Sequence, residues 1–142
     1  MKKLILLFFA LLFTSSLQPQ SVIINEIYNS SSNDEWIELL VVQDNLDIRG
    51  YDIRDFSSGG SAQVPLVFSN HNLWSSVRKG TIIIVARSEN TFSEDFDASD
   101  YVVVIKSGNA LYFSGNVFSI AGGSEAIQIR NNLQEHIYGV SW

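Results

Sequence analysis

The chain has 142 residues, enough for one domain with a hydrophobic core of its own. Hydrophobic residues make up 46% of it and aromatic residues 12%, which excludes an intrinsically disordered chain. The formal net charge is −6 and there is no cysteine, so disulfide bonds contribute nothing to its stability.

The first residues have the pattern of a secretory signal peptide. Met1-Lys2-Lys3 is basic, Leu4–Phe13 is an uncharged apolar run, and the small residues Thr14-Ser15-Ser16 follow. This run is shorter than the roughly 20 residues that a membrane span requires. We therefore predict a signal peptide over residues 1–20 and one domain over residues 21–142. The domain is expected to be secreted, or held in a bacterial cell envelope.

Cleavage of this leader makes the remaining chain more acidic. Removing Lys2 and Lys3 from the nine basic residues leaves seven against fifteen acidic ones, a net charge of −8. Such a charge repels the phosphates of nucleic acids and anionic lipid headgroups. Nucleic acid is therefore not the expected partner.

From Ser21 onward, short apolar runs alternate with turn residues, which is the pattern of consecutive β-strands. The first two runs are Val22–Tyr28 and Glu35–Val42. Side chains alternate between the two faces of a strand. In the second run, one face then carries Glu35, Ile37, Leu39 and Val41, and the other carries Trp36, Glu38, Leu40 and Val42.

The later runs predict further strands. Tyr51–Phe56 alternates apolar and charged residues, as a half-exposed strand does, and Val64–Phe68 reads as an edge strand because Pro65 has no N–H to donate. Thr81–Ala86 lacks polar alternation, so we expect a central strand covered on both faces. The remaining predicted strands are Tyr101–Ile105, Ala110–Phe113, Glu125–Ile129 and His136–Val140, the last two forming a closing hairpin. An all-β antiparallel sandwich or barrel follows.

Three segments together resemble the bacterial lamin-tail domain. They are Val22-Ile23-Ile24-Asn25-Glu26-Ile27, Asp34-Glu35-Trp36-Ile37-Glu38-Leu39 and the stretch 46–55. The resemblance implies an immunoglobulin-like antiparallel β-sandwich of about eight to nine strands. It also implies a binding or anchoring unit of exported proteins, often found beside nucleases or phosphoesterases. The sequence departs from the family at Tyr51, where Trp is usual, and at Val41-Val42-Gln43, where a polar step is usual.

The residues that carry this resemblance are also the candidate site: Asn25, Glu26, Glu35, Trp36 and Glu38. If the first two strands pair, the carboxylates of Glu26, Asp34, Glu35 and Glu38 could converge and coordinate Ca²⁺. In the alternative interpretation they are structural: Glu26 and Glu38 pair with Arg49, Arg54 or Arg87, or accept backbone N–H groups. We expect the structural role and no cofactor, with Ca²⁺ as the possible exception.

Other candidate motifs are weaker. The segment Glu94–Asp100 resembles the start of a calcium loop but has Asp100 where Gly is required and Lys106 where Glu is required, so a solvated acidic loop is predicted. His71 and His136 are too isolated for a zinc site. The aromatic residues Trp36, Tyr51, Phe56, Trp74 and Phe118 could form a surface for stacking sugars, although a core role is the default.

The sequence contains no nucleophile elbow and no cysteine, so we expect a protein that is not an enzyme. The predicted function is a secreted β-sandwich module for binding, adhesion or anchoring, whose partner is a protein or a polysaccharide at the cell surface. The alternative is an accessory domain of an exported metal-dependent nuclease or phosphoesterase.

Overall fold

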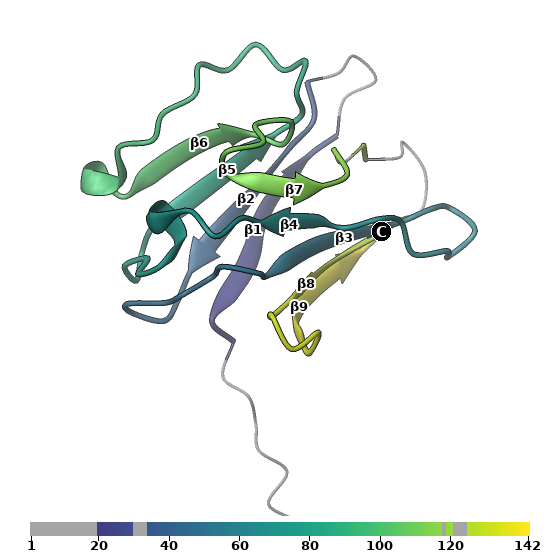
Figure 1. Ribbon diagram of the computed structural model, residues 1–142. Coiled ribbons are helices and arrows are strands. Elements are labelled where there is room, and N and C mark those ends of the chain that lie inside the picture. The colour runs from purple at the N-terminus through teal and green to yellow at the C-terminus, as the bar shows by residue number, and fades with distance from the viewer. Residues whose placement is uncertain (1–19, 30–33, 118, 121–124) are drawn as a thin grey trace, which may run out of the picture.

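The computed structural model describes residues 20–29, 34–117, 119–120 and 125–142, and within these ranges the chain forms nine strands in two sheets that pack as a β-sandwich (Figure 1). This confirms the predicted all-β fold. Apart from Gln20, the predicted signal peptide lies outside the described residues, as does Phe118. No helix in the described part of the chain has the length and apolar character needed to cross a membrane.

The sheets contain four and five strands. The first has the order β1 (Val22–Tyr28), β2 (Trp36–Val41), β5 (Ile82–Ala86), β6 (Val102–Lys106). The second has the order β7 (Phe113–Gly115), β4 (Leu66–Phe68), β3 (Asp52–Phe56), β8 (Ala126–Arg130), β9 (His136–Ser141). Two short 3₁₀ helices lie in connections, η1 (Asn72–Trp74) and η2 (Ala98–Asp100).

Adjacent strands pair in antiparallel fashion except β5 and β6, which are parallel. A parallel pair requires a crossover connection, and the segment 87–101, which includes η2, supplies it. This segment returns along the free edge of β6, where Asp95 and Val104 exchange backbone hydrogen bonds of 2.8 and 2.9 Å. The edge of the first sheet is thereby partly covered.

The core lies between the two sheets and follows from the alternation of each strand. In β2, Ile37, Leu39 and Val41 are fully buried, whereas Trp36, Glu38 and Leu40 between them are partly exposed, which agrees with the predicted division of the strand into two faces. Ile83 and Val85 of β5 extend this inner face, and the second sheet contributes Ile53, Ile127 and Ile129. These Ile, Val and Leu residues favour extended backbone and fill the space between the sheets.

Three expectations about single strands were wrong. The predicted strand Ala110–Phe113 is a turn up to Tyr112, and β7 begins only at Phe113. β5 is central but not covered on both faces, because Ile82 and Ile84 remain partly exposed on the outer side of the first sheet. β4 is not an edge strand, because it lies between β7 and β3. Pro65 precedes β4, so its missing N–H costs no ladder bond, and its carbonyl accepts a hydrogen bond from the Asn116 N–H at 3.1 Å.

The predicted closing hairpin is present as β8 and β9. Its turn is held by the Asn131 side chain, whose oxygen accepts hydrogen bonds from the N–H groups of Leu133 and Glu135, both at 2.9 Å. Gln134 adopts a positive φ of 65° within this turn. An Asn side chain that binds nearby backbone groups is a common way to fix such a turn.

Candidate functional site

The pairing of β1 with β2 places the predicted site residues. Ile24 pairs with Leu39 and Glu26 pairs with Glu38, so Asn25 is an extra residue that forms a β-bulge. Beyond the bulge, Tyr28 pairs with Trp36. The bulge keeps Ile24 and Ile27 on the inner face while turning Glu26 and Tyr28 outward, beside Glu38 and Trp36.

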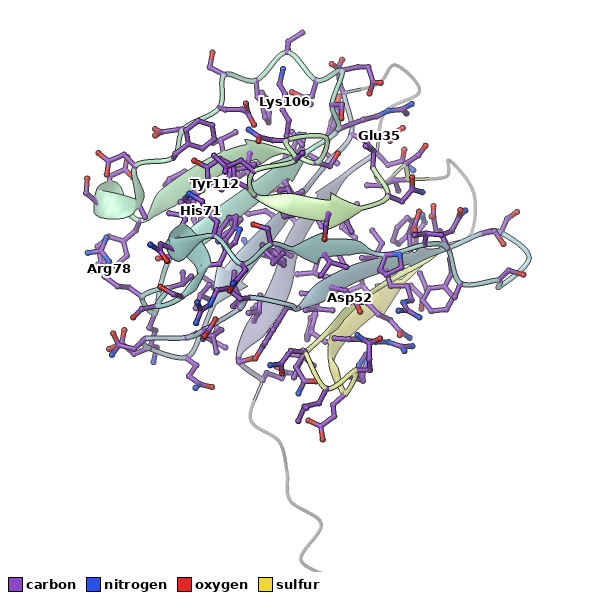
Figure 2. All side chains as sticks on the ribbon, in the orientation of Figure 1. Glu35, Asp52, His71, Arg78, Lys106 and Tyr112 are labelled. Atoms are coloured by element: carbon purple, nitrogen blue, oxygen red, sulfur yellow. The ribbon has the colours of Figure 1, made fainter. Side chains whose placement is uncertain are left out.

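Glu35 lies on the inner face, where only 5% of it is exposed. Its carboxylate oxygens lie 3.2 and 3.3 Å from Arg87 Nη1, and Oε2 also accepts a hydrogen bond from the Ile120 N–H at 3.1 Å. The backbone is tied as well, because the Arg87 N–H donates to the Glu35 carbonyl at 2.9 Å. Figure 2 shows Glu35 at the end of the sandwich far from Arg78. Glu35 thus fastens the start of β2 to the segment that follows β5.

Glu26 and Glu38 lie opposite one another on the outer face. The Asn25 side-chain amide donates a hydrogen bond of 2.6 Å to Glu38 Oε1. Because strand pleating separates alternate residues, Glu35 does not share a side of the sheet with Glu26 and Glu38. The signature acids are therefore distributed over both faces.

The predicted arginine partners of Glu26 and Glu38 were wrong. Arg49 pairs with Asp47 at 2.5 Å, Arg54 with the buried Asp52 at 3.5 Å, and Arg87 with Glu35 and, through Nε, with Glu89 at 3.0 Å. Each arginine pairs with an acid on its own strand, in its own turn or at a neighbouring strand end. Three of these pairs join residues two positions apart in the sequence, whereas the Arg87–Glu35 pair depends on the pairing of β2 with β5, which the position of a charge in the sequence does not reveal.

Three aromatic side chains gather where β1 ends and β2 begins. The rings of Tyr28 and Trp36 are nearly parallel, 13° apart with centroids separated by 5.7 Å. Phe92, from the segment after β5, packs against Trp36 with a centroid distance of 6.2 Å and a tilt of 42°. Tyr28 is 46% exposed and Phe92 is 38% exposed. Together with Asp34, Asn90 and Thr91 they line a surface hollow of about 260 Å³, which we call the aromatic hollow. Figure 1 shows the end of β1 and the start of β2, which carry Tyr28 and Trp36, side by side at the top of the first sheet.

A buried asparagine holds the two sides of the aromatic hollow together. Asn90 is 2% exposed, and its side-chain amide donates to the Asp34 carbonyl at 2.8 Å. Its side-chain oxygen accepts from the Phe92 N–H, also at 2.8 Å. Both ends of this side chain are therefore used to fix Phe92 beside the start of β2.

The other candidates lie elsewhere. Carboxylates of the acidic loop bind local backbone: Glu94 accepts from the Lys106 N–H, Asp97 from the Ser99 N–H and Asp100 from the Val102 N–H. The hydrogen bonds from Ser99 hold the pKa of Asp97 below its usual value. The loop is exposed, but its acids act as turn and cap residues, which the prediction of a merely solvated loop did not include.

The two histidines lie in different parts of the fold and have different contacts. His71 caps η1 by accepting a hydrogen bond from the Leu73 N–H at 3.1 Å, and its ring packs edge-on against Tyr112 at 4.7 Å (Figure 2). His136 begins β9 and is exposed. Within the ranges that the structure describes, no three His, Asp or Glu side chains are grouped so that they could hold a metal ion.

Two of the five aromatic residues predicted as candidates for sugar stacking belong to the core or pack against it. Trp74 is fully buried and Tyr51 packs against the core cluster, while Phe118 lies outside the described residues. Among those that the structure describes, Trp36 is the one that lines the aromatic hollow. The default expectation of a core role therefore holds for Trp74 but not for Trp36, because the alternation of β2 turns Trp36 outward.

Neither a protein-family model nor a curated protein matches this chain. The candidate site is therefore defined by its own geometry. Sequence reasoning missed Tyr28, Asn90 and Phe92. The pairing of the first two strands could have placed Tyr28 opposite Trp36, but no sequence signal connects Phe92, in an irregular segment, to them.

Proposed function

We propose that this chain is an exported, non-catalytic β-sandwich module of immunoglobulin-like, lamin-tail type that binds a component of the bacterial cell envelope. The β-sandwich, the leader-like first residues and the lamin-tail signature support it. The observation that carries the proposal is the aromatic hollow. Single exposed apolar residues are ordinary on protein surfaces, but a contiguous group of exposed aromatic rings indicates a surface used for binding.

The contacts of the signature residues support a structural role for the acids and a binding role for the aromatic residue. Glu35 is engaged by Arg87 and the Ile120 N–H, and Glu38 by the Asn25 amide. These bonds stabilise the strand ends that carry Trp36. A binding surface supported by rigid strands needs little reorganisation when a ligand arrives.

The experiment is a binding assay with isolated bacterial cell envelopes. The purified full-length chain, carrying a fluorescent label, is sedimented with increasing amounts of envelope material, and the bound fraction is measured. We expect saturable binding that unlabelled protein displaces. Binding that rises linearly without saturation would contradict the proposal.

A second measurement addresses the non-catalytic part of the proposal. The same protein is incubated with nucleic acid and phosphoester substrates in Ca²⁺, in Mg²⁺ and in chelator. We expect no turnover and equal melting temperatures, because a cation bound only by the folded state would raise stability. Turnover that disappears in Glu26→Ala or Glu38→Ala would support a metal-dependent hydrolase instead.

A further inference from the structure

We infer that the aromatic hollow binds one pyranose ring of an uncharged polysaccharide. The inference rests on the proposed binding function and names the ligand class of that same site. It starts from the size and lining of the hollow. A volume of about 260 Å³ lies just below the range of pockets that hold drug-sized ligands, so one ring of a longer chain is a fitting occupant.

The aromatic rings match the apolar face of a sugar. A pyranose ring presents C–H groups on its faces, and these pack on the electron-rich face of an aromatic ring. Tyr28 and Trp36 lie nearly parallel and offset, while Phe92 is tilted toward Trp36. The hollow therefore offers apolar contact from two directions.

The polar lining matches the hydroxyl groups at the edge of a sugar. Asp34 and Thr91, which carry a carboxylate and a hydroxyl, line the same hollow. A carboxylate offers about four lone-pair sites, so it can accept a hydrogen bond from a sugar hydroxyl in addition to its other interactions. One site therefore offers aromatic rings for the apolar faces of a sugar and polar residues for its hydroxyl groups.

The same lining disfavours two other ligand classes. An acidic polysaccharide or a nucleic acid would bring negative charge to Asp34 and to a protein whose net charge is already −6. A proline-rich peptide packs well on aromatic rings, but proline has no N–H to donate to an acceptor such as Asp34. A neutral sugar has both the apolar face and the donors.

The hollow is also held in shape before any ligand arrives. Asn90 fastens the Phe92 backbone to the Asp34 carbonyl, and the Arg87–Glu35 pair anchors the same segment to the start of β2. Fixing the binding groups in advance lowers the entropy cost of association.

The test is affinity gel electrophoresis of the full-length protein. Native gels contain the uncharged polysaccharides laminarin, galactomannan, dextran or xylan, the acidic polysaccharide alginate, or polyproline. We expect at least one uncharged polysaccharide to retard the protein. Trp36→Ala and Tyr28→Ala should each weaken the retardation by about tenfold or more, as central aromatic contacts do. Trp142→Ala removes a tryptophan that is 43% exposed and does not line the hollow, so it should leave binding unchanged.

Near-UV circular dichroism and the melting temperature verify that the variants fold, and Tyr28→Ala decides the result if Trp36→Ala is unfolded. Failure of every uncharged polysaccharide to retard the protein would overturn the inference. Retardation unaffected by the hollow variants, or seen only with alginate or only with polyproline, would overturn it as well. If envelope binding saturates in any of these cases, the binding function stands and only the ligand class is wrong.

Discussion

Asp55 is a carboxylate on the core-facing side of β3, where it shares a face with Ile53 and pairs with Ile127. It is 7% exposed, and burial raises its pKa above the ordinary value. A group whose pKa is higher in the folded state binds its proton more tightly there. The penalty of its charge is therefore absent at pH values below the unfolded pKa of about 3.9 and appears as the pH rises through the folded pKa.

Asp55→Asn should therefore stabilise the protein at pH 7, and the gain should shrink toward pH 4. Thermal unfolding of both proteins at the two pH values measures this difference. Asp47→Asn is the control with the opposite sign, because the hydrogen bond from Arg49 holds the pKa of Asp47 below its ordinary value. That variant should lose stability at pH 7 and approach the parent as acid protonates Asp47. If Asp55→Asn raised the stability equally at both pH values, the gain would not come from the raised pKa of Asp55.

Glu35 is also a buried acid, but it forms an ion pair with Arg87. Glu35→Ala removes the carboxylate from Arg87 and from the Ile120 N–H. Breaking a buried pair costs about 3–5 kcal/mol, and we expect about 3 because Arg87 is partly exposed and keeps Glu89. Urea unfolding measures the loss.

Glu89→Ala serves as the matched control, because it removes the other acid bound to the same guanidinium group. Glu89 is exposed, so its loss should cost less than about 1 kcal/mol. Equal effects of the two substitutions would mean that Glu35 is not the anchor of this segment.

At the scale of an element, the pairing of β4 with β7 depends on a glycine. Gly115 has a φ of 92°, and a Cβ added there would overlap the Pro65 carbonyl oxygen. Gly60 has a similar φ of 78° but open space where a Cβ would lie. The two positions therefore separate the cost of the backbone conformation from the cost of close approach.

Gly60→Ala should cost about 1–2 kcal/mol, the penalty of a left-handed backbone alone. Gly115→Ala adds a clash with backbone that cannot move aside freely, so we expect about 3 kcal/mol or more. Chemical denaturation of the two variants makes the comparison. Similar losses at both positions would show that β7 shifts readily away from Pro65.

The strands themselves could be predicted from the sequence, because alternation and turn residues are local signals. Val22–Tyr28 was predicted with the bounds that β1 has, and the two faces of β2 were assigned correctly. The order of strands within a sheet was not accessible in this way. Pro65 suggested an edge for β4, whereas the chain places β7 outside it. Pairing depends on contacts between distant segments, which a local pattern does not encode.

The sequence predicted only part of the candidate site. Trp36 was singled out from the sequence, and the aromatic hollow contains it. Phe92 could not be connected to it, because its position depends on the crossover after β5 and on the buried Asn90. The ion-pair partner of Glu35 was missed for the same reason: Arg87 reaches it only through the pairing of β2 with β5.

At the scale of the whole molecule, the two sheets share one core, and Trp74 lies where they meet. Its ring packs edge-on against Phe68 of β4 at 5.0 Å, and its indole N–H donates to the Tyr112 carbonyl at 2.9 Å. Trp74 also lines a cavity of about 40 Å³ with Ile83 and Val103 of the first sheet. Loosening either sheet would therefore change the surroundings of Trp74.

We accordingly expect the two sheets to unfold in a single cooperative transition. The chain has three tryptophans, so replacing Trp36 and Trp142 with Phe leaves Trp74 as the only tryptophan. In this variant, the urea midpoint followed by fluorescence should coincide with the midpoint followed by far-UV circular dichroism, because a two-state transition gives every probe the same midpoint. The parent protein, followed by circular dichroism, controls for effects of the two substitutions. If fluorescence changed at a lower urea concentration than the strand signal, the sheets would separate before they unfold, and the shared core would not be the source of cooperativity.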